Sequence, residues 1–178
     1  DTRPTMDQVK ENVAKAIDLD IPHMSLYSLI LENHTVFMNR MRRGKLPLPK
    51  EELEAEMFEY IIEELETAGF DHYEISNFSL PGLYSRHNSS YWTEKKYLGC
   101  GPSAHSYNGV SRQWNVASLD TYIKGISAGT PVFEIEELDL YTRYNDFVIT
   151  RIRTEWGMPL SKLRDEFGEK LYDYCLRM

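Results

Sequence analysis

The segment from Asp71 to Tyr107 concentrates the residues of this chain that could do chemistry. It holds three of the five histidines and one of the two cysteines. Within it, a short run brings an imidazole, an amide, a phenol and an indole together: His87, Asn88, Tyr91 and Trp92. An imidazole can shuttle protons or bind a metal near neutral pH, and aromatic rings can stack on a flat ligand. From residue types alone, a loop held by aromatic packing is the plainer interpretation.

A glycine corner follows the histidine motif. Gly99 and Gly101 flank Cys100, and glycine allows the backbone to approach a ligand closely. An ordinary turn into a strand would have the same sequence. Cys100 cannot hold an iron–sulfur cluster by itself, because such sites need several thiolates and the other cysteine, Cys175, is distant along the chain.

The elements that must position these residues alternate between helix and strand. Helical periodicity predicts helices over residues 5–19 and 50–68, the first opened by a capping-box sequence. A short strand-like run with little charge predicts a strand over residues 23–28, and a second short strand is predicted after the next helix, over residues 72–76. This order favours an α/β fold with a parallel sheet, so the two strands are expected to be parallel neighbours.

The second half of the chain is predicted to be mostly helical. Strands over residues 98–107 and 111–115 are joined by Asn-Gly, a strong hairpin signal. Helices are predicted over residues 118–128, 138–156, 159–167 and 169–177. In the first of them, the residues expected to face inward are Leu119, Tyr122, Ile123 and Ile126. We place a domain boundary near Phe133, which separates residues 1–132 from an all-helical part, 133–178.

Composition limits the classes of protein. The chain carries a formal charge of −8, and many of its glutamates lie on the helix predicted over residues 50–68, where a solvated face explains them. The acidity argues against non-specific binding to nucleic acid. Two cysteines in unlike settings do not suggest a disulfide framework, so a reducing, cytoplasmic location is expected. No apolar run is long enough to cross a membrane.

Four spaced motifs together resemble one family. In order they read HMSLYSLILENHT, YEISNF, RHNSSYW and YLGCGPSAHSY. They are similar to the oxygen-independent coproporphyrinogen III oxidase family of radical S-adenosylmethionine proteins, and the resemblance covers essentially the whole chain. Two features resemble the haem-chaperone branch. Ser76-Asn77-Phe78 stands where the oxidases carry Asp-His-Phe, and the run from His87 to Trp92 is similar to that branch's signature.

The resemblance implies a fold and a set of cofactors. Residues 1–132 would be the C-terminal portion of a partial (β/α)6 TIM-like radical-SAM barrel with its β-extension. Residues 133–178 would be a truncated, helical, winged-helix-like domain. The family uses a 4Fe-4S cluster, held by a Cys-x3-Cys-x2-Cys motif, to cleave S-adenosylmethionine to a radical. This sequence has no such motif, so we expect a C-terminal piece of a longer protein that is inactive alone.

The resemblance also implies two sets of contact residues. Those matching contacts to S-adenosylmethionine are Ile30, Cys100 and Gly101. Those matching the haem motif are His87, Asn88, Tyr91 and Trp92. No catalytic or metal-ligating residue is assigned within this chain.

The expected parent protein is a cytoplasmic haem chaperone that binds haem and passes it to apo-haemoproteins. One alternative is the oxidase reaction, oxidative decarboxylation of coproporphyrinogen III to protoporphyrinogen IX. Another, from a different class, is a helix-turn-helix nucleic-acid-binding module in the helical tail, which the acidic charge disfavours. Because unpaired strand edges template association, the isolated chain is also expected to self-associate through the strand at residues 23–29.

Overall fold

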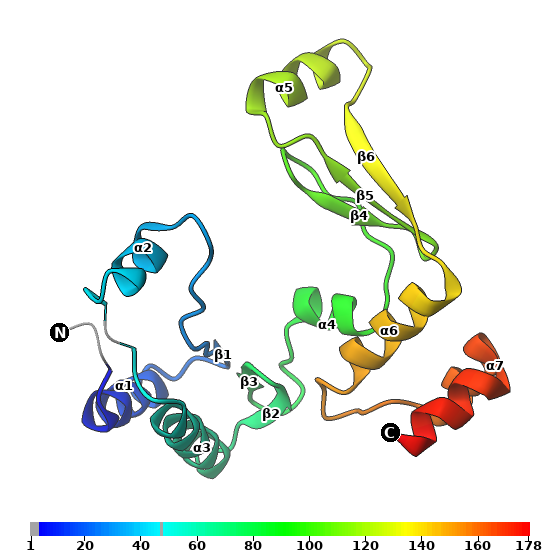
Figure 1. The fold of residues 1–178 in the computed structure, drawn as a ribbon. Helices are drawn as coiled ribbons and strands as arrows, with labels where there is room; N and C mark the ends of the chain where they lie inside the picture. The colour runs from blue at the N-terminus through cyan, green and yellow to red at the C-terminus, as the bar shows by residue number, and fades with distance from the viewer. Residues whose placement is uncertain (1–3, 47) are drawn as a thin grey trace. The chain divides into compact units, whose positions relative to one another are not determined.

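The computed structural model describes residues 4–46 and 48–178, and the chain divides after Ser85 into two compact units. The first unit contains α1 (Met6–Asp18), β1 (His23–Ser25), α2 (Val36–Arg42), α3 (Glu51–Thr67), β2 (Asp71–Glu74) and β3 (Asn77–Ser79). The second contains α4 (Arg86–Trp92), β4 (His105–Tyr107), β5 (Ser111–Asn115), α5 (Leu119–Ser127), β6 (Phe133–Glu137), α6 (Leu140–Arg151) and α7 (Leu160–Arg177). Figure 1 shows this order along the ribbon. The α/β class predicted from the sequence is confirmed.

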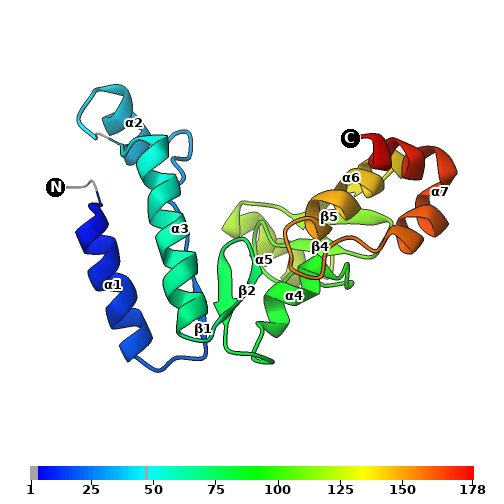
Figure 2. The same cartoon turned by 90° about the horizontal axis from the view of Figure 1, so that it is seen from below.

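Two helices and a small sheet enclose the core of the first unit. Helices α1 and α3 lie side by side (Figures 1 and 2). The predicted capping box of α1 is present: the Thr5 hydroxyl accepts from the Gln8 amide, and the Gln8 side chain accepts from the Thr5 amide. The buried residues of the core are Met24, Leu65, Phe70 and Phe78. Burial of these side chains fixes the sheet against the helices.

The predicted pairing of the first two strands is wrong. Strands β1 and β2 run in the same direction, but β3 lies between them and pairs antiparallel with both. The cause is a tight turn at Ile75 and Ser76, which makes residues 71–79 a hairpin instead of one strand. The Ser76 amide donates to the Glu74 carboxylate at 3.1 Å and stabilises that turn. Strand β1 remains at an edge of the sheet, as the sequence led us to expect.

A second three-stranded sheet, ordered β4-β5-β6, lies in the second unit. The predicted hairpin between β4 and β5 is confirmed, and the Asn108 side chain accepts from the amides of Val110 and Ser111 in its turn. Strand β6 was not predicted, so the chain from Phe133 onward is not wholly helical. Its glutamate-rich sequence gives no strong strand signal; pairing with β5 along all five residues defines it.

Helices α6 and α7 enclose the hydrophobic core of the second unit. Their buried residues are Tyr144, Phe147, Leu163, Phe167 and Leu171. The two helices predicted at the C-terminus form α7, which is kinked at Gly168 with φ of +80°. The predicted inward face of α5 is wrong for Leu119, Ile123 and Ile126, which are exposed. Its fourth residue, Tyr122, is half-buried. Among the described residues, the helices are too short or too polar to span a lipid bilayer.

Candidate functional site

The histidine motif is a short helix, α4, where the sequence had predicted a loop. Helical spacing puts His87 and Tyr91 on one face, with ring centroids 5.2 Å apart in an edge-to-face arrangement. The Tyr91 hydroxyl lies 3.5 Å from Nε2 of His87, a long contact that leaves the imidazole weakly held. His87 is exposed. The imidazole is therefore accessible to a ligand outside the chain.

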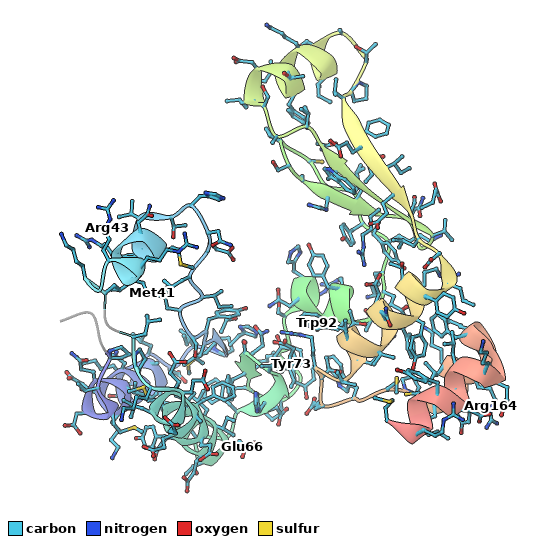
Figure 3. The ribbon with its side chains drawn as sticks, viewed as in Figure 1. Met41, Arg43, Glu66, Tyr73, Trp92 and Arg164 are labelled. Atoms are coloured by element: carbon cyan, nitrogen blue, oxygen red, sulfur yellow. The ribbon has the colours of Figure 1, made fainter. Side chains whose placement is uncertain are left out.

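Trp92 is the last residue of this helix and packs against the segment that follows α6. Its ring lies under the Arg153 guanidinium, which is 5.1 Å from the ring centroid. The indole Nε1 is buried and has no hydrogen-bond partner among the described residues. An unsatisfied buried donor is unusual in a folded protein. Asn88 is half-buried on the same helix. Figure 3 labels Trp92 on α4.

A ladder of aromatic rings continues from the motif into the unit. The Tyr91 ring packs edge-to-face on Tyr97 at 5.1 Å, and Tyr97 lies 6.1 Å from Tyr107. The backbones of Tyr97 and Tyr107 exchange two hydrogen bonds, which fixes the inner end of the ladder. Burial raises the pKa of both inner hydroxyls. The two phenols therefore stay protonated at neutral pH and can donate hydrogen bonds.

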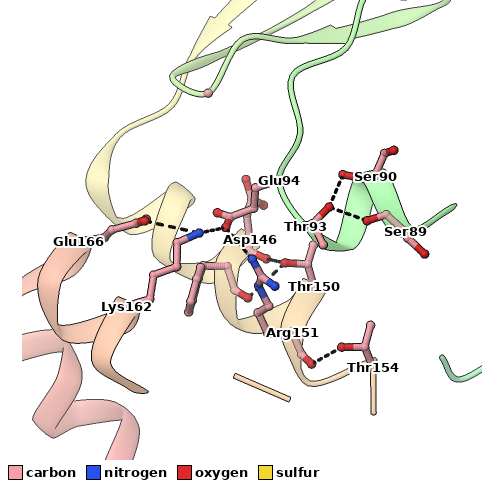
Figure 4. Close-up of polar contacts among 12 residues, drawn as sticks. Ser89, Ser90, Thr93, Glu94, Asp146, Thr150, Arg151, Thr154, Lys162 and Glu166 are labelled. Carbon is pink, nitrogen blue, oxygen red and sulfur yellow. Dashed lines mark hydrogen bonds and ion pairs between the residues drawn. The ribbon is translucent and has the colours of Figure 1, made fainter. Parts of the chain in front are cut away.

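A charged cluster, shown in Figure 4, ties the end of α4 to α6 and α7. The Glu94 carboxylate accepts from Lys162 Nζ at 2.7 Å and from the Arg151 guanidinium at 3.1 Å. Burial alone would raise the pKa of Glu94, but these two hydrogen bonds and the nearby positive charges hold it below its usual value. Lys162 also lies 3.5 Å from Glu166. The cluster fixes the position of the motif within its unit.

A pocket of about 490 Å³ lies between the aromatic ladder and the charged cluster. It is lined by Tyr91, Trp92, Glu94, Lys95, Tyr97, Tyr107, Gly109, Arg112, Arg143, Asp146, Thr150, Lys162 and Glu166. Arg112 is ion-paired with Asp146, and this bond offsets the burial that would lower the pKa of the guanidinium. Pockets of this volume hold small organic ligands. We call it the ladder pocket.

Hydrogen bonds to the Tyr122 and Asn115 side chains hold the glycine corner in place. The Gly101 amide donates to the Tyr122 hydroxyl at 3.0 Å, and its carbonyl accepts from the Asn115 side chain at 2.9 Å. Asn115 also bonds the Gly99 carbonyl at 3.2 Å, while the Cys100 side chain is exposed. The residues matched to S-adenosylmethionine are thus divided: Cys100 and Gly101 belong to the second unit, and Ile30, which is exposed, belongs to the first.

Gly99→Ala is expected to disrupt this corner. An added Cβ would lie 2.1 Å from the His105 carbonyl oxygen, so the backbone at the start of β4 would have to move. We expect a lower thermal midpoint and loss of amide protection at the corner, measured by hydrogen exchange. Gly109→Ala separates backbone strain from crowding, because φ at Gly109 is +102° and the added Cβ would meet only the end of the Lys96 side chain. Equal protection in Gly99→Ala and the wild type would contradict the close approach.

A second polar network lies in the sheet of the first unit. The Asn77 side-chain amide donates to the buried Glu74 carboxylate at 2.5 Å, and the side-chain carbonyl of Asn77 accepts from the Ser25 hydroxyl at 2.7 Å. On the same sheet, the His23 imidazole lies 2.7 Å from the hydroxyl of the fully buried Tyr73. Glu74 and Asn77 lie opposite each other in the hairpin.

His23 should make the first unit sensitive to mild acid. Burial lowers the pKa of the imidazole below its ordinary 6.5, so the folded state binds the proton less readily than the unfolded chain. Its contribution to stability is present above about pH 6.5 and is lost as the pH falls through the lower folded pKa. Urea denaturation from about pH 7.5 to about pH 5 measures the effect.

The variant His23→Gln should flatten that pH dependence, while His34→Gln, at an exposed position, should leave it unchanged. An unaltered slope in His23→Gln would show that another group is responsible.

The chain does not supply a site for a 4Fe-4S cluster. The sequence contains two cysteines, Cys100 and Cys175, and no Cys-x3-Cys-x2-Cys motif. Among the described residues, no three histidine, cysteine, aspartate or glutamate side chains gather as a metal site. Iron–sulfur clusters require several thiolates. We therefore derive no step of a reaction through a cluster held by these residues.

The fold defines the class of protein. The structure is similar to that of coproporphyrinogen III oxidase (HemN) from Escherichia coli, a radical SAM enzyme, with a TM-score of 0.70 and 15% sequence identity. The match covers 96% of this chain and 42% of that one. This likeness establishes the radical-SAM fold. No protein-family model matches the chain.

Sequence relatives identify the family within that class. The chain is 42% identical to heme chaperone HemW of Lactococcus lactis, over 94% of this chain and 45% of that protein. It is 36% identical to heme chaperone HemW of Bacillus subtilis, over 94% of this chain and 44% of that protein. Identity is 37% to a mitochondrial radical S-adenosyl methionine domain-containing protein 1 of Bos taurus, over 82% of this chain and 37% of that protein. The chain belongs to the family of these relatives, which are named heme chaperone HemW and radical S-adenosyl methionine domain-containing protein 1, and it spans less than half the length of each.

The structure brings together only part of what the sequence singled out. His87, Tyr91 and Trp92 lie on one helix, and two of them line the ladder pocket. The charged residues of the pocket were not predicted. A signal exists on α6, where Arg143, Asp146 and Thr150 recur at helical spacing.

Proposed function

We propose that the chain is part of a radical-SAM-like haem chaperone, which binds haem and transfers it to apo-haemoproteins. The observation that carries the proposal is the exposed His87 imidazole on α4, next to a pocket lined by aromatic rings. Neutral imidazole is a common ligand of haem iron. The name heme chaperone, carried by the relatives from Lactococcus and Bacillus, supports the same function.

Each residue of the motif has a role in this proposal. His87 would bind the iron through its exposed imidazole, and Asn88 would help to orient the helix toward the ligand. Tyr91 and Trp92 would form an apolar wall for the flat porphyrin ring.

The finer architecture is also proposed from the family. Residues 1–132 would form the C-terminal portion of a partial barrel with its β-extension, and residues 133–178 a winged-helix-like domain. In the longer protein, Ile30, Cys100 and Gly101 would contact S-adenosylmethionine. When bound beside a 4Fe-4S cluster, that cofactor supplies radical chemistry in this class of proteins. The residues of this chain would bind and orient the cofactor, and would not hold the cluster.

Oxidative decarboxylation of coproporphyrinogen III is the second candidate, favoured by the likeness of the fold to the Escherichia coli oxidase. At 15% identity this likeness concerns the fold, and a fold hosts several functions. Ser76 and Asn77 stand where the oxidases have aspartate and histidine. In this chain the Asn77 side chain is engaged with Glu74 and Ser25. This substitution favours the chaperone function.

Two assays on the full-length protein with its cluster reconstituted test the proposal. We expect stoichiometric haem binding, followed by transfer to an apo-haemoprotein such as apomyoglobin, seen as the growth of its absorbance spectrum. We expect no appearance of protoporphyrinogen IX from coproporphyrinogen III. Sustained turnover to protoporphyrinogen IX without haem transfer would overturn the chaperone function in favour of the oxidase.

Self-association of the isolated chain is a separate proposal. Strand β1 lies at an edge of its sheet, and the apolar residues that follow it, Tyr27, Leu29 and Ile30, are exposed. Exposed strand edges beside apolar surface pair with other chains. Sedimentation of the isolated chain over a range of concentrations tests this, and a monomer at every concentration would refute it.

A further inference from the structure

We propose that the ladder pocket binds the carboxylate edge of the porphyrin, with Arg143 as the residue that recognises a propionate group. The inference rests on the proposed haem function and assigns a second contact point beyond the histidine motif. The ligand class is a flat aromatic molecule bearing carboxylates.

The aromatic ladder connects the histidine motif to the pocket. Tyr91 belongs to both, because its hydroxyl lies 3.5 Å from the His87 imidazole and its ring lines the ladder pocket. From Tyr91 the rings of Tyr97 and Tyr107 continue at centroid separations of 5.1 and 6.1 Å. A porphyrin whose iron binds His87 would cover Tyr91 and direct its edge into the pocket. The protonated phenol of Tyr97 can donate a hydrogen bond there, whereas the Tyr107 hydroxyl already donates to the Gly109 carbonyl at 3.3 Å.

The charges that line the pocket favour an anion. Its lining contains four cationic side chains and three carboxylates, in a chain whose overall formal charge is −8. Two of the cations are neutralised: Arg112 pairs with Asp146, and Lys162 pairs with Glu94. A local excess of positive charge on an acidic protein attracts an anionic ligand selectively.

Arg143 is the cation that is available. Within residues 4–46 and 48–178, it forms no ion pair or side-chain hydrogen bond, and its guanidinium lies 6.0 Å from the centre of the Phe167 ring. The side chain is half-buried, and its charge acts on the Tyr107 hydroxyl, where it opposes the rise in pKa that burial causes. Lys95 also lines the pocket without an ion pair, but it is exposed. A half-buried guanidinium binds a carboxylate through two parallel hydrogen bonds, which a lysine cannot do.

The test compares ligands with and without carboxylates on the full-length protein. We expect Arg143→Met to weaken the binding of haem about tenfold or more, the loss of one charge-assisted contact. Haem dimethyl ester, in which both propionates are blocked, should bind the wild type and Arg143→Met equally. Arg143→Lys should recover part of the affinity. Arg164→Met, which removes an arginine of α7 outside the pocket, is the matched control and should bind haem like the wild type.

Iron-free protoporphyrin IX separates this proposal from the function on which it rests. Its binding, followed by fluorescence, should depend on Arg143 and not on His87, because the ligand has no iron. If thermal melts show that both proteins are folded, equal affinity of the wild type and Arg143→Met for haem would overturn the propionate site. The chaperone function would remain. A wild-type protein that binds neither haem nor protoporphyrin would overturn both.

Discussion

Replacing His87 with alanine in the full-length protein is expected to lower haem affinity by at least about tenfold. Removing a residue that supports a metal ligand already costs about 10–100-fold in metal affinity, and here the ligand itself would be lost. His87 is exposed, and its one recorded hydrogen bond is the 3.5 Å contact with Tyr91. The thermal midpoint should therefore stay close to that of the wild type, since exposed substitutions change stability by within about 0.5 kcal/mol.

Haem titration by absorbance, beside a thermal melt of the same sample, measures both effects. His105→Ala is the matched control, because His105 is an exposed histidine of the same unit and does not line the ladder pocket. A structural role for His87 makes the opposite forecast: a lowered thermal midpoint, with haem affinity unchanged in the folded fraction. Binding of S-adenosylmethionine should survive, because its proposed contacts are Ile30, Cys100 and Gly101.

Glu94→Gln is expected to have the largest effect on stability. The substitution keeps the shape of the side chain but leaves the positive charges of Arg151 and Lys162 without their shared carboxylate. The Arg151 side chain is only 12% exposed, so its charge is poorly solvated after the change. We expect a loss of about 2–3 kcal/mol in the free energy of unfolding, less than for a fully buried pair because Lys162 reaches solvent.

The effect of Glu94 should depend on pH in a defined direction. The folded-state pKa of Glu94 lies below its ordinary 4.5, so its contribution is present above that pH and is lost as the pH falls through the lower folded value. The gap between wild type and Glu94→Gln in urea denaturation should thus close in acid. Glu155→Gln, at an exposed position of the same unit, is the control. A gap that persists in acid would mean that the carboxylate charge is not what stabilises the unit.

Local signals in the sequence predicted much of the secondary structure. The Thr5 cap, the apolar stripe of α3 and the Asn108-Gly109 turn each depend on residues within a few positions, and each is present. The wrong strand pairing came from Ile75 and Ser76, because their residue types do not mark a two-residue turn and residues 71–79 look like one continuous strand. Strand β6 was missed for a related reason, since its partner strand and not its own composition defines it.

Only the part of the candidate site whose residues lie close together in the sequence was predictable. The residues of the histidine motif are adjacent in sequence, so family resemblance and residue type could find them. The partners of Glu94 lie 57 and 68 positions further along the chain, at Arg151 and Lys162. Contacts over such separations depend on how α6 and α7 pack on each other, and no periodicity in a single helix reveals them. The ladder pocket therefore emerged only from the three-dimensional structure.

The most direct test of the account is the identity of the iron ligand in the haem complex of the full-length protein. Electron paramagnetic resonance and resonance Raman spectra of the ferric complex report whether an imidazole is bound. We predict a histidine-ligated spectrum for the wild type, its loss in His87→Ala, and its recovery when free imidazole is added to that variant. A wild-type spectrum without an imidazole ligand, or the same histidine-ligated spectrum in His87→Ala, would contradict the assignment of His87 on α4 as the residue that holds haem.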